Sequence, residues 1–172
     1  SPRLVDTDYN GPSGKIKATM NLIKDEMADN HKILLFSQFT SALAILKEKL
    51  ANAGIKYFVI EGKTKKADRL QFVDKFNSYD QPAVFLISLK AGGTGLNLTS
   101  ADVVIHFDPW WNIAAENQAT DRAHRIGQKN NVTIYKMIAQ NTIEEKIIEM
   151  QQKKAALANS ILSGNELANA VI

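Results

Sequence analysis

The stretch AVFLISLKAGGTGLNL, residues 83–98, joins an almost continuous apolar run to a glycine-rich loop. A run without alternation of polar and apolar residues is typical of a strand that is buried on both faces. Similar runs occur in KILLFS (32–37), KYFVIE (56–61), VVIHF (103–107) and VTIYKMIA (132–139). Five short strands, of which the first four in chain order are nearly continuous in Val, Ile, Leu and Phe, predict a parallel sheet covered by helices.

Helical patterns lie between these runs. Apolar residues recur at helical spacing over residues 16–27, 43–50 and 70–76, and residues 113–124 can form a fourth helix. The second pattern stops before Gly54, which is a signal for the end of a helix. Strands that alternate with helices imply right-handed βαβ units, so we expect an α/β fold with helices on both faces of the sheet.

The C-terminal part, residues 141–172, has a different pattern. Residues 142–145, TIEE, match a capping box, and an apolar stripe follows at Ile143, Ile147, Met150, Leu157 and Ile161. This pattern predicts a long amphipathic helix of about five turns. The helix either closes its own domain or braces another domain, and both interpretations stay open.

The remaining boundaries follow from composition. Residues 1–13 are polar and contain Pro and Gly, so we expect a linker there, and residues 14–140 form one α/β domain. We therefore expect the chain to be a piece of a larger protein. The 172 residues carry a formal net charge of +3, which permits an anionic partner without requiring one.

Several classes of function find no support in the sequence. There is no cysteine, and the three histidines show no metal-binding spacing, so we expect no metal site of the protein's own. No apolar run approaches the ~20 residues of a membrane span, so we expect no membrane partner.

Two short motifs imitate nucleotide-binding sequences. GKT at 62–64 looks like the end of a Walker A loop, but that loop needs glycine at position 57, where Tyr57 stands. Lys63, with the nearby basic residues, either contacts nucleic-acid phosphates or forms a solvated face. Asp108 ends an apolar run as a Walker B aspartate does, but a carboxylate that holds a turn is the favoured interpretation.

The glycine-rich loop and the tryptophan pair are more informative. Three glycines at 92, 93 and 95, together with Lys90, Thr94 and Asn97, favour a polar ligand site over a plain turn. Adjacent tryptophans at 110 and 111 cannot both point into one core, so we expect one of them to contact a partner or DNA.

Arg122 and Arg125 lie three residues apart in QATDRAHRIGQ (118–128). On a helix they would share one face, where two permanent positive charges repel each other unless an anion lies between them. The pair therefore predicts an anion, although the chain has no complete phosphate-binding loop.

These motifs together resemble one family. SLKAGGTGLNLTSADVVIHFDPWWN (88–112), followed by QATDRAHRIGQ, resembles motifs V and VI of the Swi/Snf-type DNA-translocating ATPases, a branch of the superfamily-two helicases. KILLFSQFT (32–40) resembles their motif IV, and residues 144–162 are similar to their brace helix. The resemblance spans roughly residues 14–162, with Ile113 as a departure where the family usually has Pro.

The resemblance implies a RecA-like second helicase lobe, with a parallel sheet, helices on both faces and a long C-terminal brace helix. The Walker motifs of the family lie in the first lobe, so ATP with Mg²⁺ would be bound mainly there. Arg122 and Arg125 would act as catalytic arginine fingers, and Gly95, Asn97 and Gln118 would face the nucleotide. The residues implied to face DNA are Ser37, Gln38, Lys63, Thr64, Ser88, Lys90, Gly93, Thr94 and Trp110.

The implied partners are double-stranded DNA, the N-terminal RecA-like lobe of the same protein, and a protein target on DNA. The full-length protein would hydrolyse ATP, and the isolated chain would be inactive. A bacterial host, favoured by short loops, would place the protein in the cytoplasm with the nucleoid, and a eukaryotic host would place it in the nucleus. The alternatives are a non-catalytic α/β module that binds nucleotide or phosphate and a strand-separating helicase.

Overall fold

The computed structural model describes residues 3–7, 12–88, 97–108, 132–139, 144 and 146–157. In chain order the elements are β1 (Arg3–Thr7), α1 (Pro12–Ala28), β2 (Ile33–Ser37), α2 (Thr40–Asn52), β3 (Tyr57–Ile60), α3 (Lys66–Ser78), β4 (Val84–Ser88), β5 (Val103–His106) and β6 (Thr133–Ala139). Residues 146–157 are helical. The helix expected over 113–124 lies outside the described residues.

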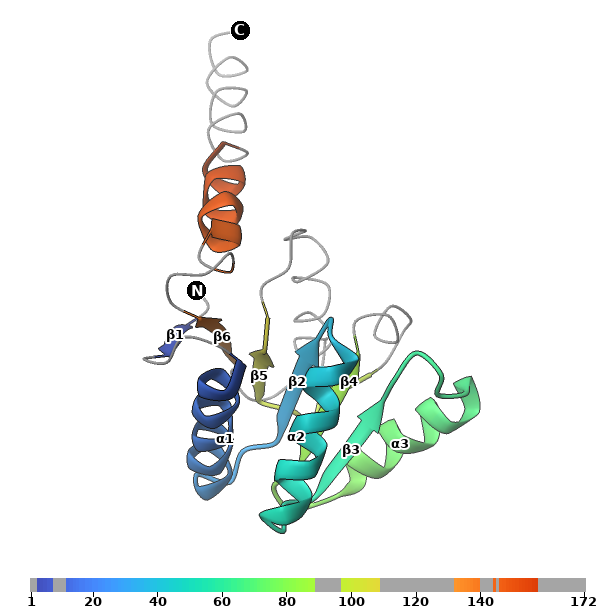
Figure 1. Ribbon diagram of the computed structural model, residues 1–172. Coiled ribbons are helices and arrows are strands. Elements are labelled where there is room, and N and C mark those ends of the chain that lie inside the picture. The colour runs from blue at the N-terminus through green and yellow to red at the C-terminus, as the bar shows by residue number, and fades with distance from the viewer. Residues whose placement is uncertain are drawn as a thin grey trace, which may run out of the picture.

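The strands form one six-stranded sheet in the order β1-β6-β5-β2-β4-β3, and every pair is parallel (Figure 1). β2 lies between β5 and β4 near the middle of the sheet. The parallel sheet expected from the apolar runs is confirmed, and each of the five runs contains one of its strands.

β1 was not expected, because it lies inside the segment 1–13 that the sequence suggested as a linker. Its sequence, RLVDT, has only two apolar residues, so it lacks the continuous run that marks a doubly buried strand. β1 pairs with β6 in register from Arg3 with Tyr135 to Thr7 with Ala139. β1 is therefore held by backbone hydrogen bonds to β6, which the apolar pattern of its own sequence does not reveal.

Alternate side chains of the strands lie in two apolar layers, one on each face of the sheet, as the two-residue period of a strand requires. On one face the strand residues pack with Val73 and Phe76 of α3. On the other face they pack with residues of α1 and α2, including Ile23, Leu46 and Leu50. Helices therefore cover both faces of the sheet, as expected for this α/β fold.

The end of α2 follows the signal in the sequence. Gly54 has a φ of 70°, in the left-handed region that glycine adopts without a steric penalty. Its N–H donates to the Ala51 carbonyl at 3.1 Å, and the Ile55 N–H donates to the Leu50 carbonyl at 3.0 Å. These two bonds are those of a Schellman motif, which turns the chain from α2 toward β3.

The helical patterns of residues 16–27, 43–50 and 70–76 lie in α1, α2 and α3, as expected, but some residues of the apolar stripes are exposed. In α3, Val73 and Phe76 are buried, but Leu70 is 54% exposed. In the helix of residues 146–157, Ile147 is buried, whereas the stripe residues Met150 and Leu157 are exposed. Helical spacing gives the direction of an apolar face but not how much of that face meets the sheet.

Candidate functional site at the carboxyl ends of the strands

Ligands in open α/β sheets bind beyond the carboxyl ends of the strands. Ser37 ends β2, Ser88 ends β4, and Asp108 follows β5 by two residues. Because the strands are parallel, these residues lie at the same end of the sheet, where the carboxyl ends of the strands meet. The helix of residues 146–157 extends beyond the same side of the molecule, near β6 (Figure 1).

Asp108 joins the end of β5 to the loop after β2. Its carboxylate is 1% exposed and accepts a hydrogen bond from the Ser37 hydroxyl at 2.5 Å and from the Gln38 N–H at 3.1 Å. Burial raises the pKa of Asp108 above its ordinary value, while both hydrogen bonds and the charge of Lys15 act in the opposite direction. These contacts agree with its interpretation as a carboxylate that holds a turn.

Lys15, in the first turns of α1, is the buried cation of this region. It is 3% exposed, and its Nζ lies 2.6 and 2.7 Å from the two carboxylate oxygens of Glu144. The same Nζ lies 4.8 Å from the centre of the Phe107 ring. Burial lowers the pKa of Lys15, and the hydrogen bond to Glu144 and the charges of Glu144 and Asp108 oppose that shift.

Sequence reasoning missed the pair of Lys15 and Glu144, which lie 129 positions apart. One local signal was present, because Lys15 shares a helical face with Thr19 and Ile23, which are both fully buried. A lysine on the buried face of a helix needs an anionic partner. The chain supplies that partner from the start of the C-terminal helical segment, so the ion pair attaches this segment to α1.

The GKT sequence forms a turn closed by its own side chains. The Thr64 N–H donates to the Glu61 carbonyl, and the Thr64 hydroxyl accepts from the Glu61 N–H, both at 3.0 Å. Arg69 donates to the carbonyls of Thr64 at 2.9 Å and Gly62 at 3.1 Å. Lys63 extends from this turn with 87% of its side chain exposed. The turn is therefore no phosphate-binding loop, in agreement with Tyr57 in β3.

The residues expected to face ligands have different surroundings. Ser37 and Ser88 are buried, and the Ser37 hydroxyl is engaged with Asp108. Gln38 and Thr64 are half-buried, and Lys63 and Asn97 are exposed. The Asn97 carbonyl accepts from the Asn77 side chain at 2.7 Å.

The structure thus brings Ser37 and Gln38 together around Asp108. Eight expected site residues lie outside the described part of the chain: Lys90, Gly93, Thr94, Gly95, Trp110, Gln118, Arg122 and Arg125.

Comparison with known proteins identifies the family. Residues 14–127 match the family model of the helicase conserved C-terminal domain. A solved structure, the C-terminal part of the Fun30 ATPase domain, is similar with a TM-score of 0.74 and 40% identity, over 80% of this chain and 45% of that one. The chain belongs to the C-terminal helicase lobes of the Swi/Snf-type ATPases.

Sequence relatives of this Swi/Snf-type lobe come from distant organisms. An uncharacterised ATP-dependent helicase of Mycoplasma pneumoniae is 47% identical over 87% of this chain and 15% of its own length. A putative SWI/SNF-related regulator of chromatin from Arabidopsis thaliana is 44% identical over 90% of this chain and 18% of its own length. The chromatin-remodelling ATPase INO80 of Schizosaccharomyces pombe is 38% identical over 90% and 10%.

The chain therefore spans less than a fifth of the length of these relatives. Because they include a bacterium, a plant and a fungus, they do not support the expected preference for a bacterial host. Within the described part of this Swi/Snf-type lobe, no helix has the length and apolar character needed to cross a membrane.

Proposed function

We propose that this chain is the second lobe of an ATP-dependent translocase that moves on double-stranded DNA and acts on a protein target there. It would contribute Arg122 and Arg125 to an ATP site completed by a first lobe outside this sequence. The observation that carries the proposal is the match of residues 14–127 to the helicase C-terminal domain, in a fold whose GKT sequence forms a closed turn. Such a lobe meets a nucleotide that another lobe holds.

The division of the site has a physical consequence. Phosphoryl transfer is catalysed mainly by positioning and by stabilisation of charge, and an arginine finger contributes ~10³–10⁵ in rate. That contribution corresponds to roughly 4–7 kcal/mol of barrier. Arginines on a separate lobe reach the phosphates when the lobes close, so hydrolysis is coupled to closure. Asn97, Gly95 and Gln118 would support the nucleotide beside them, and Mg²⁺ with the triphosphate would be held mainly by the first lobe.

DNA would lie along the loops that follow the strands. Lys63 is suited to a phosphate contact because its ammonium group is in solvent, with the Glu61 carboxylate 3.6 Å away as its nearest acidic partner. Gln38, Thr64, Lys90, Gly93, Thr94 and Trp110 complete the proposed contact surface. Ser37 and Ser88 are buried, so they would shape the loops rather than offer hydroxyl groups to the backbone of DNA.

Phosphate release tests the proposal. The full-length protein should hydrolyse ATP, and duplex DNA should stimulate it, whereas the 172-residue chain with ATP and the same DNA should release phosphate at the background rate. Adding the separately prepared first lobe to this chain should restore part of the turnover. Robust DNA-stimulated turnover by this chain alone would overturn the idea of a divided site.

A further inference from the structure

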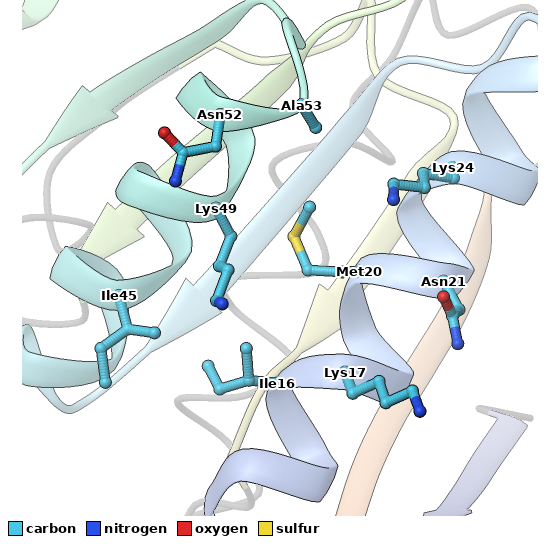
Figure 2. Close-up of a pocket in the computed structure, with 9 residues that line it drawn as sticks. All are labelled: Ile16, Lys17, Met20, Asn21, Lys24, Ile45, Lys49, Asn52 and Ala53. Atoms are coloured by element: carbon cyan, nitrogen blue, oxygen red, sulfur yellow. The ribbon is translucent and has the colours of Figure 1, made fainter.

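A groove of about 810 Å³ runs between α1 and α2 on the outer side of the molecule (Figure 2). It lies on the helical layer and is separate from the carboxyl ends of the strands, where the ATP and DNA sites are proposed. Its lining residues are Ile16, Lys17, Met20, Asn21, Lys24, Ile45, Lys49, Asn52 and Ala53.

The two helices present matching stripes to the groove. On α1 the stripe is formed by Ile16, Met20 and Lys24, which are spaced by four residues and share one face. On the other side, Ile45 and Lys49 of α2 and Ala53, the residue that caps this helix, have the same spacing. Each stripe spans eight residue steps, which is about 12 Å of helix. The groove is therefore long enough to receive two turns of a third helix.

One part of the groove is apolar. Ile16 and Met20 belong to the core layer beneath α1 and α2 and form the floor. In Figure 2 both project from α1 toward α2. Ile45 is 43% exposed on the opposite wall, so a large aliphatic side chain faces water above an apolar floor. Covering these surfaces would remove apolar area from water, which favours association.

The other part is basic. Lys24 and Lys49 are exposed on the two walls, and Lys49 extends from α2 into the space between the helices (Figure 2). Lys17 adds a third positive charge at the outer edge of α1. None of the nine lining residues is acidic. Asn21 and Asn52 add amide groups that can donate to carboxylates.

We propose that this groove docks an acidic amphipathic helix of a partner protein. Leucine-like side chains of that helix would contact Ile16, Met20 and Ile45, while its carboxylates would reach Lys24 and Lys49. This is the helix-in-groove mode of recognition, with shape and apolar contact giving affinity and charge giving selectivity. A nucleic-acid backbone would satisfy the lysines but leave the apolar floor without a matching surface.

A synthetic peptide provides the probe. We would titrate a fluorescein-labelled 18-residue helix, with leucines on one face and glutamates on the other, with the full-length protein and follow anisotropy. We expect saturable binding that weakens as salt increases, because the lysine contacts are screened. A peptide with lysine in place of every glutamate should bind at least tenfold more weakly.

Matched substitutions distinguish binding in the groove from non-specific binding to other surfaces of the protein. Ile45→Asp and the double change Lys24→Glu with Lys49→Glu should each weaken binding at least tenfold without lowering the melting temperature, because these side chains are exposed. Leu70→Asp and Lys75→Glu place the same changes on α3, over the other face of the sheet, and should leave binding unchanged.

Four results would overturn the proposal. The first is that the peptide does not bind to the full-length protein, whether another segment covers the groove or not. The α3 variants lose as much affinity as the groove variants. The lysine peptide binds as well as the glutamate peptide. Duplex DNA displaces the peptide and its own affinity falls in Ile45→Asp, which would assign the groove to nucleic acid.

Discussion

Two aspartates at opposite ends of β5 hold the two ends of β2 by the same pattern of bonds. Before β5, Asp102 accepts from the Lys32 N–H at 3.0 Å and lies 2.6 Å from Nδ1 of His31. After β5, Asp108 accepts from the Gln38 N–H at 3.1 Å and from the Ser37 hydroxyl at 2.5 Å. Each carboxylate thus uses one oxygen for a backbone N–H and the other for a side chain.

The surroundings of the two aspartates differ. The Asp102 side chain is 15% exposed, and its partner His31 is in contact with solvent. Asp108 is 1% exposed, and the positive charge that acts on it is that of Lys15, itself buried and paired with Glu144. At the amino end of the sheet, the protonation of His31 in its pair with Asp102 can therefore change with pH. The carboxyl end holds a cluster in which Lys15, Ser37 and Asp108 are buried and the Glu144 side chain is 20% exposed.

Burial decides what each arrangement contributes. An exposed pair contributes little because water and salt screen it. A buried pair is expensive to form, but loss of one member is costly because it leaves an unpaired buried charge. We therefore expect the carboxyl end to be sensitive to substitution and the amino end to be sensitive to pH.

The largest effect should follow from Lys15→Met. The methionine has a side chain of similar length but lacks the ammonium group that contacts Glu144 and whose charge acts on the buried Asp108. Removing this buried charge from its pair should lower the free energy of unfolding by about 3 kcal/mol. Urea unfolding of the 172-residue chain measures it. The matched control is Lys24→Met, an exposed lysine on the same helix, which should change stability by less than about 0.5 kcal/mol. Equal losses in the two variants would show that the buried pair has no special weight.

A smaller difference should separate the two aspartates. Asp108→Ala removes the carboxylate that accepts from the Ser37 hydroxyl and the Gln38 N–H at a buried position, so we expect a loss of about 2–3 kcal/mol. Asp102→Ala should cost about 1 kcal/mol, because water can reach the groups that it leaves. The same unfolding measurement compares them. A larger loss for Asp102 would contradict the role given to burial.

The pair of His31 and Asp102 at the amino end should instead respond to pH through His31. The hydrogen bond to Asp102 raises the pKa of His31 above 6.5, and the charges of Asp102, Glu26 and Asp29 act in the same direction. A raised pKa means that the contribution to stability is fully present below pH 6.5 and is lost as pH rises through the pKa of the folded state.

Melting temperatures measured from pH 5.5 to pH 9 test this sign. The wild-type chain should lose more stability over that interval than His31→Gln, whose side chain can donate to Asp102 but does not titrate. Parallel curves for the two proteins would show that the pair with Asp102 has no weight in the folded state.

Much of the fold could be predicted from local patterns. The runs that became β2 and β4 were continuous in apolar residues, which is typical of central strands, and Gly54 ended α2 as its position indicated. β1 was not predicted, because this edge strand forms by pairing with β6 and has no apolar run of its own. The exposure of Leu70 could not be predicted, because spacing alone does not reveal the width of the surface that α3 covers.

The candidate site was harder to predict because its contacts join distant segments. The sequence indicated that Asp108 holds a turn, but not that Ser37 and Gln38 are its partners, since that depends on β2 and β5 being neighbours. The pair of Lys15 and Glu144 depends on where the C-terminal helical segment meets α1. The roles of Arg122 and Arg125 come from the motif and remain predictions.

Arg125→Lys in the full-length protein tests the division of the ATP site between two lobes most directly. Lysine keeps one positive charge but loses the planar fork that can bind two phosphate oxygens. Single-turnover hydrolysis with duplex DNA should slow by about two orders of magnitude or more, while ATP affinity and melting temperature change little. Wild-type hydrolysis by a stably folded Arg125→Lys protein would contradict the assignment of this arginine to the transferring phosphoryl group.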